Sequence, residues 1–183
     1  MKLWLQAFDT DLEEGLIDLK DYTLFYTTFF LSDRKSESYA LQWKHINFSI
    51  GEILIEQTLD RFGNVKSTKG NKKTLFKATT ELMELLAYWK VKQQEELKLF
   101  GLRQTQKQFL FTYNNRTNNI NFLLHTDYLN YRMKSVRRRH PELAPASPHE
   151  LRHTGTTLAK QAGVSLEAIL EALTYSDKLF SSQ

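Results

Sequence analysis

The pattern of apolar and polar positions predicts a mainly helical protein. Residues 16–30 are largely apolar and long enough for a buried helix. Residues 80–101, TELMELLAYWKVKQQEELKLFG, have the spacing of an amphipathic helix, with a glycine stop at Gly101. Residues 128–140, YLNYRMKSVRRRH, are also predicted to be helical, and residues 141–148 form a loop.

The middle of the chain has a strand pattern instead. Residues 36–48 indicate a helix that runs into a short strand, and residues 51–58, GEILIEQT, alternate as a strand does. Turn residues fill 59–72, and residues 73–79 supply a returning strand. The sequence therefore predicts one α+β domain over residues 1–183, mainly α-helical, with one small antiparallel sheet and a basic hairpin loop.

A further helix is predicted to begin at Pro148. Ser147 and Glu150 have the spacing of a capping box, and proline suits the first helical position. One face of this helix carries polar residues and the opposite face is core-like: His149, Arg152, His153 and Thr156 against Leu151, Gly155, Leu158 and Ala162. Gly163 ends the helix, and Ser165 caps the next one.

Composition excludes several classes of protein. The chain has no cysteine, which excludes disulfides and thiolate chemistry. No apolar run is long enough to span a bilayer, and the first residues lack the pattern of a signal peptide, so we expect a soluble cytoplasmic protein.

The positive charge is segregated although the net charge is only +4. Six cations and no acid lie between Arg61 and Lys77, and a second cluster spans residues 132–140. Such clusters favour a polyanionic partner, above all nucleic acid. Ordinary solvated surface lysines are the alternative.

The string HELRH, residues 149–153, matches the pattern of a zinc hydrolase. His149 and His153 would bind the metal, Glu150 would be the general base, and Glu167 or Glu171 would be the third ligand. Two features weigh against zinc: Arg152 places a fixed cation on the same face, and the capping box already uses Glu150. The two histidines can also be ordinary partly buried residues.

Residues 158–173, LAKQAGVSLEAILEAL, have the outline of a DNA-binding helix-turn-helix. The second helix would begin near Leu166 and expose Glu167 and Glu171. Carboxylates facing phosphates are unfavourable, so this segment is interpreted as a structural helical hairpin.

Three motifs follow one another along the chain: FFLSDRKSESYALQWKHINF, TKGNKKTLF and HELRHTGTT. Together they resemble the tyrosine recombinase (phage integrase) family. HELRHTGTT is similar to the family's His-x-x-Arg-His-Thr signature, and TKGNKKTLF resembles its lysine-bearing hairpin, pointing to Lys69. FFLSDRKSESYALQWKHINF aligns with the family's first arginine motif, with Ser32 in place of the usual glycine. The matching positions there are Arg34, Ser36, Glu37, Ala40, Leu41 and Trp43. The motifs occur in the family's order and cover nearly the whole chain.

The resemblance implies a role for each site residue. Arg34 and Arg152 would clamp the phosphoryl oxygens, where negative charge builds up during attack. Lys69, on a hairpin tip, would be the general acid, and His149 a base or hydrogen-bond donor. The position usually held by His or Trp is Tyr175, in LTYS, whose hydroxyl can hydrogen-bond a phosphoryl oxygen. Glu37 would brace Arg34 or its helix, and His153 would support the site.

The resemblance also implies the partners. The reaction would cut and rejoin double-stranded DNA through a 3′-phosphotyrosyl intermediate, with no metal or cofactor, and the complete protein would work as a homotetramer on DNA. The expected DNA contacts are Lys66, Lys72, Lys73, Arg137, Arg138 and Arg139.

The nucleophile of the family is a tyrosine about nine residues after the position of Tyr175. Counted along this sequence, it falls one residue beyond Gln183. We therefore expect the catalytic domain of a larger integrase, without the N-terminal DNA-clamping domain and the C-terminal tail, and inactive by itself. A DNA-binding remnant without catalysis is the remaining alternative.

Overall fold

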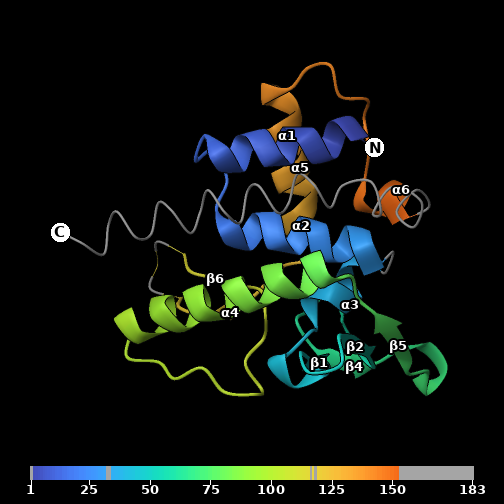
Figure 1. Cartoon of the computed structure of the whole chain (residues 1–183), viewed down its shortest axis with the longest axis vertical. Helices are drawn as coiled ribbons and strands as arrows, with labels where there is room; N and C mark the ends of the chain where they lie inside the picture. Colours follow the sequence, from blue (N-terminus) through green and yellow to red (C-terminus); the bar gives the residue numbers. More distant parts are fainter. Residues whose placement is uncertain (1, 32–33, 116, 118, 153–183) are drawn as a thin grey trace.

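The computed structural model describes residues 2–152 except 32, 33, 116 and 118. Its helices are α1 (Lys2–Glu13), α2 (Leu19–Leu31), α3 (Lys35–Tyr39), α4 (Thr80–Leu99), α5 (Tyr128–Arg139) and α6 (Pro148–Arg152). Figure 1 shows α1, α2 and α4 side by side, with α5 crossing α1 and α2. Among the described residues, no helix combines the length and the apolar character needed to span a membrane.

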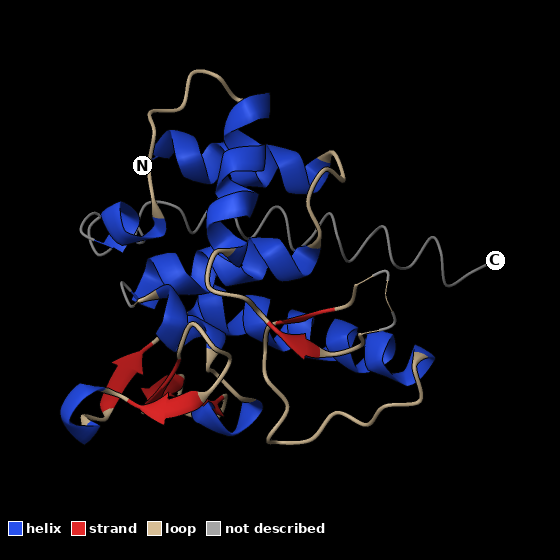
Figure 2. Ribbon diagram, turned by 180° about the vertical axis from the view of Figure 1, so that it is seen from behind, coloured by secondary structure: helices blue, strands red, loops and turns tan. Residues whose placement is uncertain are grey.

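The strands are short and form three sheets in the described part of the chain. The first pairs β1 (Ile46–Asn47), β2 (Glu52–Ile55) and β5 (Thr74–Lys77). The second pairs β3 (Gln57–Leu59) with β4 (Val65–Ser67), and the third pairs β6 (Thr112–Tyr113) with β7 (Phe122–Leu123). Figure 2 shows the first two sheets at the opposite end of the molecule from α1, and the third beside α4. The α+β class is confirmed, but the single predicted sheet is divided.

The division arises at Glu56, which lies between β2 and β3 on one nearly continuous strand. The returning strand pairs with it on both sides of this residue, Ser67 opposite Gln57 and Thr74 opposite Ile55. Residues 68–73, which include the short 3₁₀ helix η2 (Lys69–Asn71), therefore loop out opposite Glu56. We call residues 68–73 the Lys69 loop.

Helix α2 is the centre of the core. It contacts α1, α3, α4, α5 and α6, and nearly all of its side chains are buried. The Phe25 ring stacks on Phe8 of α1, with ring centroids 3.7 Å apart, and also contacts Phe29. A helix that is apolar on all sides must be covered on all sides, so the predicted buried helix is confirmed, with its start at Leu19.

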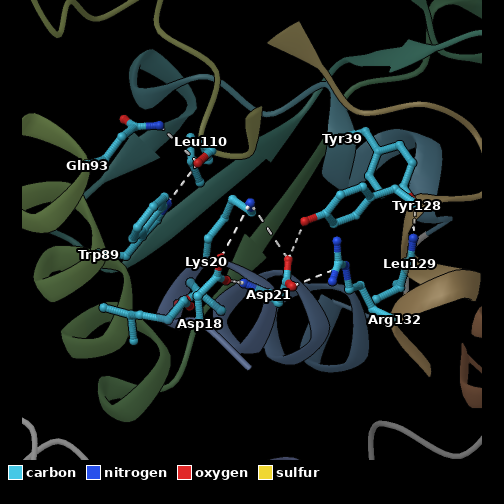
Figure 3. Close-up of polar contacts among 12 residues, drawn as sticks. Asp18, Lys20, Asp21, Tyr39, Trp89, Gln93, Leu110, Tyr128, Leu129 and Arg132 are labelled. Carbon is cyan, nitrogen blue, oxygen red and sulfur yellow. Dashed lines mark hydrogen bonds and ion pairs between the residues drawn. The ribbon is translucent and has the colours of Figure 1, made fainter. Parts of the chain in front are cut away.

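Helix α4 ends as the sequence predicts. Gly101 adopts a left-handed φ of 71°, and its amide donates to Lys98 at 3.0 Å. The amide of Leu102 donates to Leu97 at 2.9 Å, which completes a Schellman motif. At the other end, the Thr79 hydroxyl accepts from the Leu82 amide. Trp89 of α4 donates to the carbonyl of Leu110 at 2.7 Å and so holds the loop that follows the stop against the helix (Figure 3).

Helix α1 is not among the predicted elements. Its inward face carries Trp4, Leu5, Phe8 and Leu12, but also two buried aspartates, Asp9 and Asp11. The aspartates conceal the apolar periodicity because acids usually lie at the surface. Asp9 accepts from the Tyr22 hydroxyl of α2 at 2.9 Å.

Asp11 connects α1 to the end of α5. Its side chain is fully buried and receives Arg139 Nε at 2.9 Å and Nη2 at 2.6 Å, both on Oδ2. His140 Nε2 lies 2.7 Å from the other oxygen. A buried carboxylate is tolerated only with such partners, so this pairing sets the position of α5 on α1.

Asp21 makes the corresponding connection from α2 to the start of α5 (Figure 3). The Tyr128 hydroxyl donates to Asp21 Oδ1 at 2.6 Å, and Arg132 Nε lies 3.3 Å from Oδ2. Burial raises the pKa of the Asp21 carboxyl, and the nearby charge of Asp18 adds to this. Helix α5 is therefore attached to the helical core near both of its ends.

His45 is buried beneath the sheet at the end of the 3₁₀ helix η1 (Trp43–His45). Its Nδ1 accepts the Gln42 amide at 3.0 Å, which leaves Nε2 to donate to Glu56 at 3.1 Å. Burial lowers the pKa of His45. The neutral imidazole is thus the form that the fold requires.

We predict that Asp11→Asn destabilises the protein by about 3 kcal/mol, because Arg139 is left partly buried without its counter-charge. The free energy of unfolding in urea measures the loss. Glu95→Gln, which removes a surface pair with Lys92 on α4, is the control and should cost less than about 0.5 kcal/mol. Equal midpoints for the two variants would contradict the role of Asp11.

We also predict a pH-dependent contribution from His45. Its folded pKa is lowered from about 6.5, so in the window below that value the unfolded chain binds more protons. The free energy of unfolding therefore decreases as pH falls through this window. His45→Gln should give a shallower slope between about pH 5 and 7 in urea unfolding. Parallel slopes for the two proteins would refute the assignment.

Candidate functional site

A cleft of about 270 Å³ lies where α3, α5 and α6 meet. It is lined by residues from distant parts of the chain: Arg34, Lys35, Ser36, Asn130, Ser147, Pro148 and His149. The first three come from the start of α3, Asn130 from α5, and the last three from the start of α6. The structure thus brings Arg34 and His149 together, as the sequence predicts.

Arg34 lies immediately before α3 and is exposed. Its backbone is extended, with φ −79° and ψ 139°. The Glu37 carboxylate accepts the Arg34 amide at 3.0 Å, and the Glu37 amide donates to the Arg34 carbonyl at 2.8 Å. Glu37 therefore braces the helix start that carries Arg34.

Helix α6 begins with the predicted capping box. The Ser147 amide donates to Glu150 Oε2 at 2.6 Å, and the Glu150 amide donates to Ser147 Oγ at 3.3 Å. The bond from the Ser147 amide lowers the pKa of Glu150. This glutamate is engaged in starting the helix, which favours its structural role over that of a general base.

His149 is exposed in the first turn of α6, on the cleft. Arg152 is the last residue of the same helix, nearly one turn further on. The Arg152 side chain, His153 and Tyr175 lie outside the described residues. The backbone of α6 therefore places position 152 close to His149 in space, nearly one turn further along the helix.

Lys35 and Asn130 are cleft residues that sequence reasoning missed. Lys35 Nζ donates to Asn130 Oδ1 at 2.8 Å and lies 3.7 Å from Asp127. Nearby, the Tyr39 hydroxyl accepts the Leu129 amide at 2.9 Å (Figure 3). These bonds join α3 to α5. They therefore fix the start of α3, which Arg34 precedes, relative to the α5 side of the cleft. No local motif signals them because the partners are far apart in sequence.

The structure corrects the position of Lys69. The hairpin tip is the turn at 60–64, where the Asp60 amide donates to Asn64 at 2.9 Å. Lys69 lies in the Lys69 loop instead and is exposed. It is not among the residues that line the cleft.

The predicted DNA-contact lysines surround this loop. Lys66 on β4 forms an ion pair with Asp60 at 2.8 Å, and Lys73 pairs with Glu56 at 3.1 Å. The two lysine side chains are still 63% and 69% exposed. Lys72 is exposed as well. The three side chains present positive charge on the sheet end of the molecule.

A second basic surface lies at the end of α5. Lys134, Arg137, Arg138 and Pro141 line a shallow hollow of about 440 Å³. Arg137 Nε donates to the Leu143 carbonyl at 3.2 Å. Lys134 lines this hollow although the sequence did not predict it among the DNA contacts.

The prediction for Arg139 is corrected by the structure. Arg139 was predicted to contact DNA together with its neighbours, but its guanidinium is bound to buried Asp11. Successive residues of a helix point in different directions, and Arg139 turns to Asp11 on α1 while Arg137 and Arg138 line the hollow. Arg139 is therefore a structural residue.

The described residues contain no group of three His, Asp or Glu side chains arranged to hold a metal. The zinc hypothesis depends on His153 and on Glu167 or Glu171, which lie outside the described residues. In the described part of the motif, Glu150 beside His149 takes part in the capping box. This gives the zinc pattern no further support.

Comparison with solved structures finds integrases and a recombinase. The Tn1549 transposon integrase in complex with a circular intermediate DNA aligns with a TM-score of 0.64 and 20% identity, over 93% of this chain and 58% of that chain. The same integrase in complex with transposon right end DNA gives 0.62 and 19%, over 90% and 54%. XerA recombinase gives 0.60 and 17%, over 93% and 54%. These likenesses show the fold.

The chain spans between 54% and 58% of the length of these three structures. Comparison with curated protein sequences found no significant match. The sequence model of the phage integrase family, in contrast, matches residues 11–180. The match covers nearly the whole chain and confirms the resemblance that the motifs indicate. The chain belongs to the phage integrase family of tyrosine recombinases.

Proposed function

We propose that this chain is the catalytic domain of a site-specific DNA recombinase that cuts and rejoins DNA through a 3′-phosphotyrosyl intermediate. The observation that carries the proposal is the cleft between α3, α5 and α6. Arg34 and His149 share it although they lie near opposite ends of the chain, and α6 also carries Arg152. Family membership supports the same reaction class.

The two arginines form a phosphate clamp. Attack on a phosphodiester places negative charge on the non-bridging oxygens. Guanidinium groups bind these oxygens in a bidentate manner and stay charged at any working pH. Arg34 is suited to this role because its helix start is braced by Glu37. Arg152 supplies the second guanidinium, and Tyr175 donates a hydrogen bond to the same oxygens.

The proton transfers complete the step. The attacking tyrosine oxygen forms a bond to phosphorus, and its proton goes to His149 as general base. The bond from phosphorus to the 5′ oxygen breaks, and the electron pair leaves with that oxygen. Lys69 donates a proton to it as general acid. His153 supports this arrangement, and the reverse sequence rejoins the strand. No metal or cofactor takes part.

The partner is double-stranded DNA. Lys66, Lys72 and Lys73 at the sheet end, and Arg137 and Arg138 on α5, would contact its phosphates. Lys134 lines the same hollow as the two arginines and joins them. The Tn1549 integrase was solved in complex with DNA, which supports this partner. The complete protein would act as a homotetramer.

The nucleophile of this reaction would be a tyrosine. The experiments on cleavage therefore use the full-length recombinase.

We predict that Arg34→Ala slows formation of the covalent protein–DNA adduct by about 10²- to 10³-fold, because a preorganised donor to the phosphoryl oxygens is lost. Capture on a nicked suicide DNA substrate in single-turnover conditions measures this rate. Arg103→Ala is the matched control, since Arg103 is an exposed arginine beyond α4, and should leave the rate unchanged. Adduct formation by Arg34→Ala at the unmodified rate would remove Arg34 from the site.

We predict that Lys69→Ala slows cleavage of ordinary DNA by about 10²-fold. A substrate with sulfur in place of the leaving 5′ oxygen should restore the rate, because a thiolate leaves without a proton. Single-turnover cleavage of the two substrates gives the comparison.

Lys98→Ala, at the exposed end of α4, is the control for this test and should leave both rates unchanged. If Lys69→Ala is equally slow on both substrates, Lys69 is not the general acid.

A further inference from the structure

We propose that Glu56 is a positioning residue that holds the Lys69 loop in place for proton donation. The inference rests on the proposed function, in which Lys69 protonates the leaving oxygen. Glu56 does not line the cleft and would act only through the loop. Neither its position in the chain nor the family motifs single it out.

The strand register explains why Glu56 is suited to this role. The pairs Gln57–Ser67 and Ile55–Thr74 flank it directly. The partner strand thus leaves the sheet just before Thr68 and returns just after Lys73. Glu56 thus lies opposite both ends of the loop, which we call its legs: Thr68 on the first leg and Lys73 on the second.

Glu56 bonds to both legs. Its backbone carbonyl accepts the Thr68 amide at 3.3 Å, on the first leg. Its carboxylate Oε2 pairs with Lys73 Nζ at 3.1 Å, on the second leg. The bond from Lys73 is the main cause of the lowered pKa of Glu56, so the carboxylate is charged at neutral pH. One residue therefore closes the base of the loop.

His45 fixes the carboxylate from the side of the core. Its Nε2 lies 3.1 Å from Glu56 Oε1, and its Nδ1 is occupied by the Gln42 amide. The His45 side chain is 2% exposed, which prevents the imidazole from turning away. Both carboxylate oxygens thus have a partner, one from the core and one from the loop, and the carboxylate has a defined orientation.

Within the loop, the backbone is also constrained. The Thr68 hydroxyl donates to the Lys72 carbonyl, and the Asn71 amide donates to the Thr68 carbonyl at 2.9 Å. Gly70 and Asn71 take left-handed φ values of 72° and 54°. The loop is a compact unit, and its placement depends on the two legs.

In the described part of the chain, no hydrogen bond or ion pair involves the Lys69 amine, and the residue is exposed. Its position relative to the cleft therefore follows the position of the loop. A general acid must reach hydrogen-bond distance of the leaving oxygen, so loosening the base of the loop weakens proton donation specifically.

The decisive experiment compares Glu56→Gln on the two substrates described for Lys69, with the full-length recombinase and saturating DNA. The variant keeps the shape but removes the charge that binds Lys73. We expect about 10-fold slower cleavage of ordinary DNA. The substrate with a 5′ sulfur leaving group should be cleaved at the unmodified rate. Glu52→Gln is the control, because Glu52 is a carboxylate of β2, the strand that precedes Glu56. This variant should match the unmodified protein on both substrates.

A second measurement does not require catalysis. In the 183-residue chain, Glu56→Gln should increase the rate of trypsin cleavage after Lys69 several-fold, relative to cleavage after the exposed Lys107. Glu52→Gln should leave this ratio unchanged. Mass spectrometry of the early fragments gives the two rates.

The outcomes separate the inference from the proposed function. Equal slowing on both substrates, or no slowing on either, overturns the positioning role of Glu56. An unchanged trypsin ratio overturns the anchoring of the loop. Failure of the unmodified recombinase to cleave either substrate overturns the proposed function, and the trypsin comparison still decides whether Glu56 holds the loop.

Discussion

The cleft depends on the placement of α5, and two buried aspartates determine that placement. Asp11 on α1 binds Arg139 and His140, and Asp21 on α2 binds Tyr128 and Arg132. A carboxylate without partners is strongly disfavoured in the interior, so each aspartate admits only arrangements in which α5 supplies its donors. The price of burying these charges is offset by a defined direction for α5. A purely apolar contact would allow more sliding.

With α5 in place, the rest of the cleft follows. The start of α5 receives α3 through the bond from the Leu129 amide to Tyr39 and through the Lys35–Asn130 bond. Arg34 precedes α3 directly and is thereby held beside α6, which contacts α2. In the proposed function, Arg34 would thus bind phosphate from a helix start that the helical core supports.

Lys69, the proposed general acid, is supported differently. Lys69 belongs to the sheet end of the molecule, on a loop that leaves its strand opposite Glu56. In the proposed reaction the loop would let the lysine approach DNA while the strand pairs on either side stay in register. His45 joins the base of the loop to the core through Glu56. The helical part and the sheet part would therefore contribute to the proposed reaction through separate supports.

The sequence by itself determined the features that depend on local bonds. The stop at Gly101, the Ser147–Glu150 capping box and the buried course of α2 follow from residues that lie within a few positions of one another. The motifs around Arg34 and His149 also identified two residues that share the cleft. Local backbone preference and the order of motifs were sufficient for these.

Only the tertiary structure decided the features that depend on distant partners. Arg139 is not grouped with the predicted DNA contacts because Asp11 binds its guanidinium. The sequence did not predict α1 because the acids of this helix are buried. The loop opposite Glu56 replaced a simple hairpin because register is set by pairing across two strands. In each case the energy comes from a contact between residues far apart in sequence. The folded chain creates such contacts, and periodicity along the chain does not encode them.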